Sequence, residues 1–193
     1  MIRERKASIV TDNIDTFTER GVKLKSGREL EADIIVTATG LQLKVLGGME
    51  VNVDGRVIDP STVMAYKGMM FSDVPNLASA FGYTNASWTL KCDLTCDYVC
   101  RLLNYMDTNG FAACLARRDP NMSEAPFLNL NSGYIQRANR ILPRQGTKVP
   151  WKLHQNYARD LMMLRYGKLE DGTLEFSTPD RAKAPVAELA CVA

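Results

Sequence analysis

The strongest constraint on the fold comes from the run "DIIVTATG", residues 33–40. Its apolar residues Ile34, Ile35 and Val36 are consecutive, so a strand formed here would be buried on both faces, as in parallel sheets that helices cover. The strand would end in small residues, at a point where the backbone can approach another chain or a ligand closely. The run therefore predicts an α/β fold, and a plain strand followed by a tight turn is the simpler interpretation of its end.

Two β-hairpins are predicted on either side of this strand. The arms of the first are residues 22–24 and 30–32, in which apolar and polar residues alternate around a Ser-Gly turn. The arms of the second are residues 51–53 and 57–58, and they are joined by Asp54-Gly55, a dipeptide that favours the tight hairpin turn.

The stretch "FGYTNASWTLKCDL" predicts a strand that ends at Gly82, a polar loop and then a long helix. The helix is expected from about Ser87 to Met106, with Asn85 or Ser87 as its N-cap and Asn109-Gly110 after it. Its first turn has unpaired N–H groups and a positive dipole end, which can hold negative charge. An ordinary capped helix explains the same residues.

The second half of the chain carries weaker signals. Two helices are expected within residues 132–166, one over 132–141 and one over 153–166. Residues 1–170 are therefore interpreted as the ordered part. Residues 171–193 are rich in Ala, Pro and charge, and they are predicted to form a loosely ordered tail.

Composition excludes several classes of function. A net charge of +2 predicts no binding to nucleic acid, and no segment approaches the roughly 20 apolar residues of a transmembrane helix. The amino terminus has no apolar signal-peptide core, so a cytoplasmic protein with reduced cysteines is expected. Cys92, Cys96 and Cys100 share one helix face, but with His154 as the single histidine they are interpreted as packing residues rather than metal ligands. No residue pattern predicts a catalytic acid, base or nucleophile.

Four longer stretches resemble a known family. They are "GRELEADIIVTATGL", "AYKGMMFSDVPNL", "FGYTNASWTLKCDLTCDYVCRLLNYM" and "VPWKLHQNYARDL". Together they are similar to the C-terminal part of flavin-containing monooxygenases of the Baeyer–Villiger type, in the bacterial group that includes the ethionamide-activating monooxygenase. The resemblance runs from about residue 7 to about residue 170.

The resemblance implies the cofactors FAD and NADPH, and a fold with two dinucleotide-binding domains and C-terminal helices, of which this chain would hold part. Such enzymes form a C4a-peroxyflavin from molecular oxygen and oxygenate a ketone, a sulfide or a thioamide. Residues 33–40 match the strand that returns from the NADPH domain to the FAD domain. Ala38, Thr39 and Gly40 match its small-residue motif.

The resemblance also explains the polar loop before the long helix. It implies that the loop lies against the flavin ring, with the helix amino terminus facing the electron-rich edge of the ring. Trp88 would line the substrate pocket or anchor the helix. The expected cofactor-binding residues of the loop are Gly82, Tyr83, Thr84, Asn85 and Ser87.

The G-x-G-x-x-G motifs that bind FAD and NADPH in the family do not occur in this sequence. The chain is therefore expected to be a truncated C-terminal portion of a monooxygenase, inactive by itself. The alternative is a non-catalytic truncated paralogue or interaction fragment. In either case residues 33–40 would lack sheet neighbours, and the isolated chain is expected to self-associate.

Overall fold

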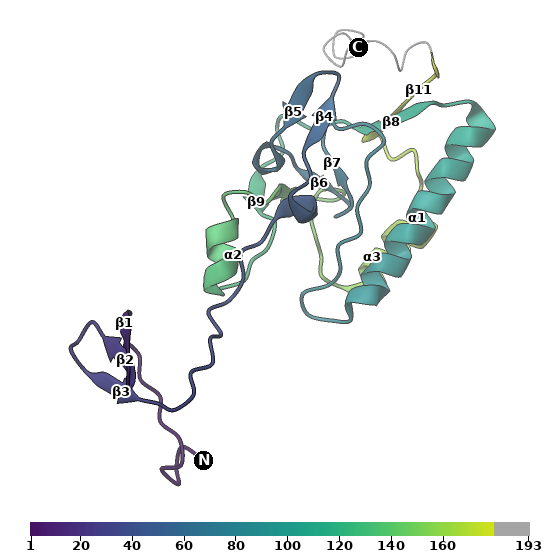
Figure 1. The fold of residues 1–193 in the computed structure, drawn as a ribbon. Helices are drawn as coiled ribbons and strands as arrows, with labels where there is room; N and C mark the ends of the chain where they lie inside the picture. Colours follow the sequence, from purple (N-terminus) through teal and green to yellow (C-terminus); the bar gives the residue numbers. More distant parts are fainter. Residues whose placement is uncertain (180–193) are drawn as a thin grey trace. The chain divides into compact units, whose positions relative to one another are not determined.

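The computed structural model describes residues 1–179 (Figure 1). It divides into two compact units, Met1–Gly40 and a larger unit that begins at Leu41. Each unit is described by itself. Within residues 1–179, no helix combines the length and the apolar character that crossing a bilayer requires.

The first unit is built on a three-stranded antiparallel sheet. Its strands β1 (Ile14–Thr18), β2 (Gly21–Leu24) and β3 (Glu29–Glu31) follow one another in the order β1-β2-β3. Val22 pairs with Leu30 across β2 and β3, which confirms the first predicted hairpin.

The predicted doubly buried strand at residues 33–40 does not form. These residues belong to no strand or helix, and the side chains of Ile34 and Val36 are 82% and 84% exposed. A run of apolar residues becomes a buried strand only when other strands hydrogen-bond to both of its edges. Among residues 1–179 no strand pairs with it, so the expectation is wrong for the described chain.

The second unit opens with the second predicted hairpin. Strands β4 (Val51–Val53) and β5 (Arg56–Ile58) pair with Val51 opposite Ile58. Both turn residues, Asp54 and Gly55, have positive φ values of 51° and 86°, as the tight primed turn of a hairpin requires. The sequence prediction is confirmed here because the turn chemistry is entirely local.

The rest of the β structure is a set of short antiparallel pairs rather than one parallel sheet. Among the described residues these pairs are β6 with β7, β9 with β10, and β8 with β11. The mixed α/β composition is as predicted, but the helix-covered parallel sheet is not present in residues 1–179. The bounds of these strands are β6 (Ala65–Tyr66), β7 (Met70–Phe71), β8 (Ala113–Ala116), β9 (Glu124–Pro126), β10 (Arg144–Gly146) and β11 (Leu174–Ser177).

The predicted tail from residue 171 needs correction at its start. Strand β11 pairs along its whole length with β8, with Leu174 opposite Ala116 and Ser177 opposite Ala113. The apolar residues Leu174 and Phe176 supply the cause, because both pack in or against the main core. Residues 180–193 of the predicted tail lie outside the described residues.

Helix α1 (Trp88–Asn109) is the long helix that the sequence predicts. Leu94, Tyr98, Leu102 and Met106 recur at intervals of four residues and are all buried, so one stripe of the helix faces the core. The helix ends as predicted at Gly110, whose φ of 68° is the left-handed conformation typical of a helix C-cap.

Other elements are shorter than predicted. No strand leads to Gly82, because residues 78–82 are extended with one isolated bridge at Ala78. The predicted helix over 132–141 is α2 (Gly133–Ala138), and the one over 153–166 is α3 (Tyr157–Leu161), continued by the π-helical turn η3 (Met162–Tyr166). Helix α3 begins late because the Asn156 side chain accepts a hydrogen bond from Arg159 N at 3.0 Å and caps it there. Two short 3-10 turns complete the second unit, η1 (Val45–Gly48) and η2 (Pro60–Thr62).

The core of the second unit contains three buried clusters. The largest joins α1 to β6, β7, β8 and β11, and the second joins α2 to residues 127–128. Cys114 belongs to the largest cluster, and burial raises the pKa of its thiol. In contrast, Cys96 and Cys100 lie exposed on α1. Within residues 1–179, no three His, Cys, Asp or Glu side chains are grouped as metal ligands would be.

Candidate functional site

The loop before α1 begins with a close contact between Gly82 and Trp88. A Cβ at position 82 would lie 2.2 Å from Cδ2 of the Trp88 ring, so only glycine leaves room for this ring. The ring of Phe81 also packs against Trp88, with 4.9 Å between the ring centroids. The small residue that the sequence marks at position 82 is therefore required by packing within the chain.

Tyr83 points into the protein rather than out of the loop. Its hydroxyl donates a hydrogen bond of 2.7 Å to Asp160 Oδ2, and Lys91 Nζ lies 3.0 Å from the same oxygen. Burial raises the pKa of Tyr83 and lowers the pKa of Lys91, and Asp160 opposes the shift at Lys91. Asp160 Oδ1 has no hydrogen-bond partner among the described residues. This Lys91–Asp160–Tyr83 cluster ties the loop to α1 and α3.

The middle of the loop is held by one residue, Gln155. Its side-chain oxygen Oε1 accepts hydrogen bonds from Thr84 N at 2.9 Å and from Thr84 Oγ1 at 3.2 Å. Its backbone oxygen accepts a third from Asn85 Nδ2 at 3.0 Å. Thr84 and Asn85 are exposed, yet their conformation is fixed by these three contacts.

Neither predicted N-cap residue caps α1 through its side chain. Ser87 occupies the N-cap position, but its Oγ lies 2.9 Å from Thr89 Oγ1 and makes no bond to the backbone. The Asn85 side chain is turned away to Gln155. This outcome differs from the expected cap, and among residues 1–179 no side chain accepts a hydrogen bond from the first-turn N–H groups of α1.

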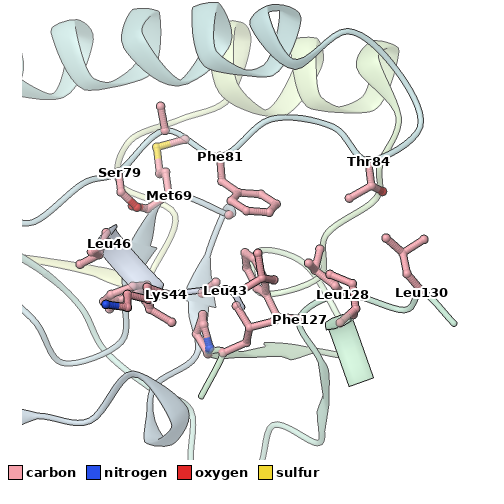
Figure 2. A pocket seen from close by; sticks show the side chains of 18 of the residues that line it. Leu43, Lys44, Leu46, Met69, Ser79, Phe81, Thr84, Phe127, Leu128 and Leu130 are labelled. Atoms are coloured by element: carbon pink, nitrogen blue, oxygen red, sulfur yellow. The ribbon is translucent and has the colours of Figure 1, made fainter. Parts of the chain in front are cut away.

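An apolar cavity of about 460 Å³ lies beside this loop (Figure 2). Phe81, Thr84 and Trp88 belong both to the loop region and to the cavity wall. Phe127 stands edge-on to Phe81, with 5.0 Å between the ring centroids. We call this space the apolar cavity. The remaining wall comes from four segments. They contribute Leu41 and residues 43–46; Ala65, Gly68, Met69 and Phe71; Ser79 and Ala80; and Leu128, Leu130, Tyr134, Ile135, Leu142 and Pro143.

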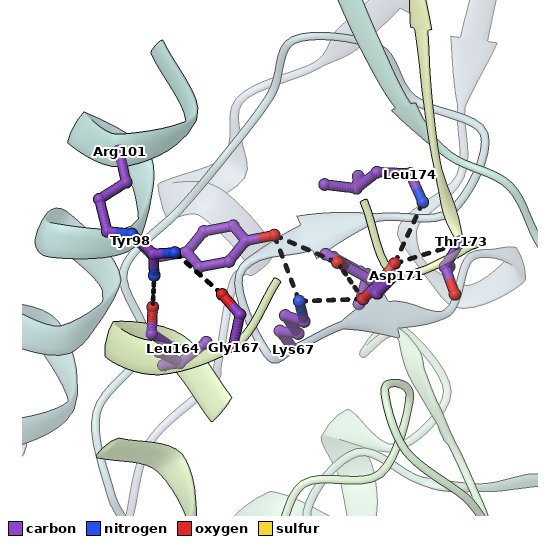
Figure 3. Close-up of polar contacts among 9 residues, drawn as sticks. Lys67, Tyr98, Arg101, Leu164, Gly167, Asp171, Thr173 and Leu174 are labelled. Carbon is purple, nitrogen blue, oxygen red and sulfur yellow. Dashed lines mark hydrogen bonds and ion pairs between the residues drawn. The ribbon is translucent and has the colours of Figure 1, made fainter. Parts of the chain in front are cut away.

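A second buried polar cluster includes Lys67, Tyr98 and Asp171 (Figure 3). Lys67 Nζ lies 2.9 Å from Asp171 Oδ2, and Tyr66 donates a hydrogen bond of 2.7 Å to the same oxygen. Lys67 also donates to Tyr98 OH at 3.3 Å. Beside it, Arg101 donates to the backbone oxygens of Leu164 and Gly167, at 2.6 and 2.9 Å. These contacts fasten the C-terminal segment to α1.

The residues predicted for the site, the cofactor contacts and the pocket residue Trp88, therefore fall into two groups. Gly82, Tyr83, Thr84, Asn85, Ser87 and Trp88 are brought together before α1. Ala38, Thr39 and Gly40 are exposed and belong to the first unit.

Sequence reasoning missed Lys91, Asp160 and Gln155. One local signal was available, because Lys91 stands on the same stripe of α1 as the buried residues Leu94, Thr95 and Tyr98. Asp160 and Gln155 carry no such local signal, because they are far from the loop in the sequence and contact it only in the folded structure.

Comparison with known proteins gives a consistent group of relatives. The chain is 51% identical over 186 residues, 96% of its length, to "FAD-containing monooxygenase EthA" of Mycobacterium tuberculosis. It is 49% identical over 177 residues to "Probable FAD-binding monooxygenase AlmA" of an Acinetobacter species. The chain spans 37% and 36% of the length of these two relatives. No family model and no solved structure matches the chain.

Proposed function

Because the chain is homologous to the C-terminal portion of FAD-containing monooxygenases, we propose that it acts as part of a flavin-dependent monooxygenase. The electron donor is NADPH, and the reaction is Baeyer–Villiger insertion or heteroatom oxygenation of a ketone, a sulfide or a thioamide with molecular oxygen. The observation that carries this proposal is the identity of 51% over 96% of the chain. The enzyme works in the cytoplasm.

The loop of residues 82–87 and the amino terminus of α1 fit an electron-rich ring. The first-turn N–H groups of α1 have no side-chain acceptor in the part of the chain that the structure describes, and Ser87 is exposed beside them. A helix amino terminus favours a nearby negative charge by about 0.3–2 kcal/mol. The flavin, when bound, would supply the oxygen-activating chemistry.

The chain's own residues would provide position and exclusion of water. Gln155 and Asp160 hold the loop by its backbone and by Tyr83, so the N–H groups of α1 keep a fixed direction. Trp88 and Phe81 form an apolar wall between the loop and the cavity, which would keep water from the reacting atoms. Ala38, Thr39 and Gly40 are proposed as a further backbone contact to the cofactor.

A second candidate is a non-catalytic fragment that binds other copies. The observation that favours it is the run Ile34, Ile35 and Val36, whose apolar side chains are exposed and whose backbone pairs with no strand among the described residues. Light scattering on the purified chain tests it. Concentration-dependent association is expected, and a monodisperse monomer at all concentrations would contradict it.

The monooxygenase proposal is tested with a chimera. The segment of Mycobacterium tuberculosis EthA that matches this chain is replaced by residues 1–193, and the purified protein is desalted after incubation with FAD. We expect a flavin absorption of about one per chain and NADPH oxidation. A chimera that unfolds cooperatively but stays colourless would overturn the proposal.

A matched pair of variants in the chimera tests the role of the α1 amino terminus. Ser87→Glu places a negative charge where the cofactor's electron-rich edge is proposed to lie, and Ser87→Gln has nearly the same size without the charge. We expect the Glu variant to lose FAD affinity by at least about tenfold relative to the Gln variant, since each factor of ten corresponds to about 1.4 kcal/mol. Equal FAD affinities of the two variants would contradict the proposal that the cofactor lies next to the amino terminus of α1.

A further inference from the structure

We propose that the apolar cavity binds a small molecule with an apolar body and a neutral or anionic polar end, and that Lys44 sets this charge preference. Only the statement that this molecule is the substrate rests on the proposed function. The statement that the cavity binds such a molecule concerns the 193-residue chain by itself.

The cavity has the size and wall of a small-molecule site. Its volume of about 460 Å³ lies within the range of roughly 300–1,000 Å³ in which proteins hold small ligands. Phe81, Phe127, Leu128 and Ile135 contribute aromatic and branched surface from three separate segments. Displacing water from such a wall favours a ligand whose body is apolar.

The charge on the cavity wall is of one sign, positive. Lys44 is the single charged residue among those that line it, and no acidic side chain does. Among the described residues Lys44 takes part in no ion pair and no side-chain hydrogen bond, while its stem packs near Gly48, 3.3 Å from where a Cβ would stand. Its ammonium group is therefore free to attract an anionic ligand end and to repel a cationic one.

Two hydroxyls of the wall, those of Ser79 and Thr84, already donate a hydrogen bond within the chain. Ser79 Oγ donates weakly to Met69 O at 3.5 Å, and Thr84 Oγ1 donates to Gln155 at 3.2 Å. Each hydroxyl then keeps acceptor lone pairs for a ligand hydroxyl. Lys44 and Thr84 lie on opposite sides of the cavity in Figure 2, so a charged end and a reacting end can be held apart.

Tryptophan fluorescence gives a direct test on the 193-residue chain, without FAD or NADPH. Trp88 lines the cavity and is 50% exposed, whereas Trp151 is 2% exposed within the main core. The probes are 4-phenylbutan-1-ol, 4-phenylbutanoate and 4-phenylbutylamine, which share one body and differ in charge at neutral pH. We expect saturable changes with the alcohol and the acid, and an affinity for the amine at least about fivefold weaker than for the acid.

Three variants assign the signal, the charge preference and the place of binding. Trp88→Phe should abolish the fluorescence change, and calorimetry then follows binding. Lys44→Met, at an exposed position, should remove the difference between acid and amine. Leu128→Trp fills the cavity and should abolish binding, while Leu103→Trp, on the exposed face of α1, is the matched control that should not.

Each contrary outcome overturns one stated part of the proposal. No saturable binding of the alcohol or the acid, in a chain that unfolds cooperatively in urea, overturns the cavity as a binding site. Equal affinity for acid and amine, or a preference that survives Lys44→Met, overturns the role of Lys44. Because no cofactor is present, these results are independent of whether the chimera retains flavin.

Discussion

Two buried clusters in the second unit are built from the same three residue types, lysine, aspartate and tyrosine, but one lies in the core and the other holds the loop. In the core cluster, Lys67 and Asp171 pair beside Tyr66 and Tyr98. In the loop cluster, Lys91 and Asp160 pair beside Tyr83. In both, the lysine is almost fully buried, the aspartate comes from the C-terminal segment, and a tyrosine donates a hydrogen bond of 2.7 Å.

The clusters differ in how completely their polar atoms are satisfied. Asp171 Oδ1 accepts from Thr173 N at 3.0 Å, and Lys67 has both a carboxylate and a phenol as partners. Asp160 is more deeply buried than Asp171, with side-chain exposures of 2% and 21%, and its Oδ1 has no partner in the described chain. A satisfied network strengthens one packed core. The unsatisfied one sits beneath an exposed loop, where its residues fix the loop's shape.

Removing one carboxylate charge from each cluster should give the largest difference in unfolding free energy between the two clusters. Asp160→Asn leaves Lys91 buried without a counter-ion, which typically costs about 3–5 kcal/mol of unfolding free energy. Asp171→Asn should cost less, because Asp171 reaches water and Lys67 keeps the Tyr98 hydroxyl. Urea unfolding of both variants measures the two values, and an equal loss would end the distinction between the clusters.

A double variant sharpens this first result. Lys91→Met with Asp160→Leu removes both charges and fills the space with apolar atoms, so it should be more stable than Asp160→Asn alone by about 1–4 kcal/mol. The same urea experiment detects the recovery. A double variant as unstable as the single one would mean that packing, rather than an unpaired charge, causes the loss.

Removing the tyrosine hydroxyls should separate a global effect from a local one. Each donates to a carboxylate, and such a bond is worth about 1.5–3 kcal/mol. Tyr66→Phe should lower the global unfolding free energy because Tyr66 is fully buried in the main core. Tyr83→Phe should mainly speed amide hydrogen exchange over residues 82–87, measured by mass spectrometry. Unchanged exchange there would show that Gln155 alone holds the loop.

Acid titration should give the smallest effect. Burial alone would raise the pKa of Asp171, but hydrogen bonds from Tyr66 and Lys67 outweigh it and lower the pKa below the ordinary value of an aspartate. A carboxyl with a lowered pKa stabilises the fold above its unfolded pKa, and this contribution is lost as pH falls through the lower folded value. Stability measured from pH 5 to pH 2 should therefore fall less steeply in Asp171→Asn than in the parent chain.

The sequence predicts what local chemistry decides. Both hairpins and the end of α1 follow from alternation, from Asp54-Gly55 and from Gly110, each of which acts within a few residues. The strand at residues 33–40 failed for the opposite reason, because its burial depends on strands that lie elsewhere in the chain or outside it.

The candidate site shows the same limit. The loop, Gly82 and Trp88 could be marked from the sequence, since a polar stretch before a helix is a local pattern. The residues that hold the loop could not, because Tyr83 and Asp160 are 77 positions apart and Thr84 and Gln155 are 71 apart. No pattern of short period relates such partners. The position of Ala38, Thr39 and Gly40 relative to the loop stays a prediction.

The buried thiol of Cys114 can serve as a reporter of how often the core of the second unit opens. Only the thiolate reacts with alkylating reagents, and Cys114 is both enclosed and held protonated by its raised pKa, while Cys96 and Cys100 face the solvent. In a pulse of iodoacetamide, alkylation of the exposed pair sets the intrinsic rate, and alkylation of Cys114 counts the molecules in which β8 has separated from β11. Peptide mapping of the alkylated chain would thus report how often the core opens under native conditions, with no substitution introduced into the protein.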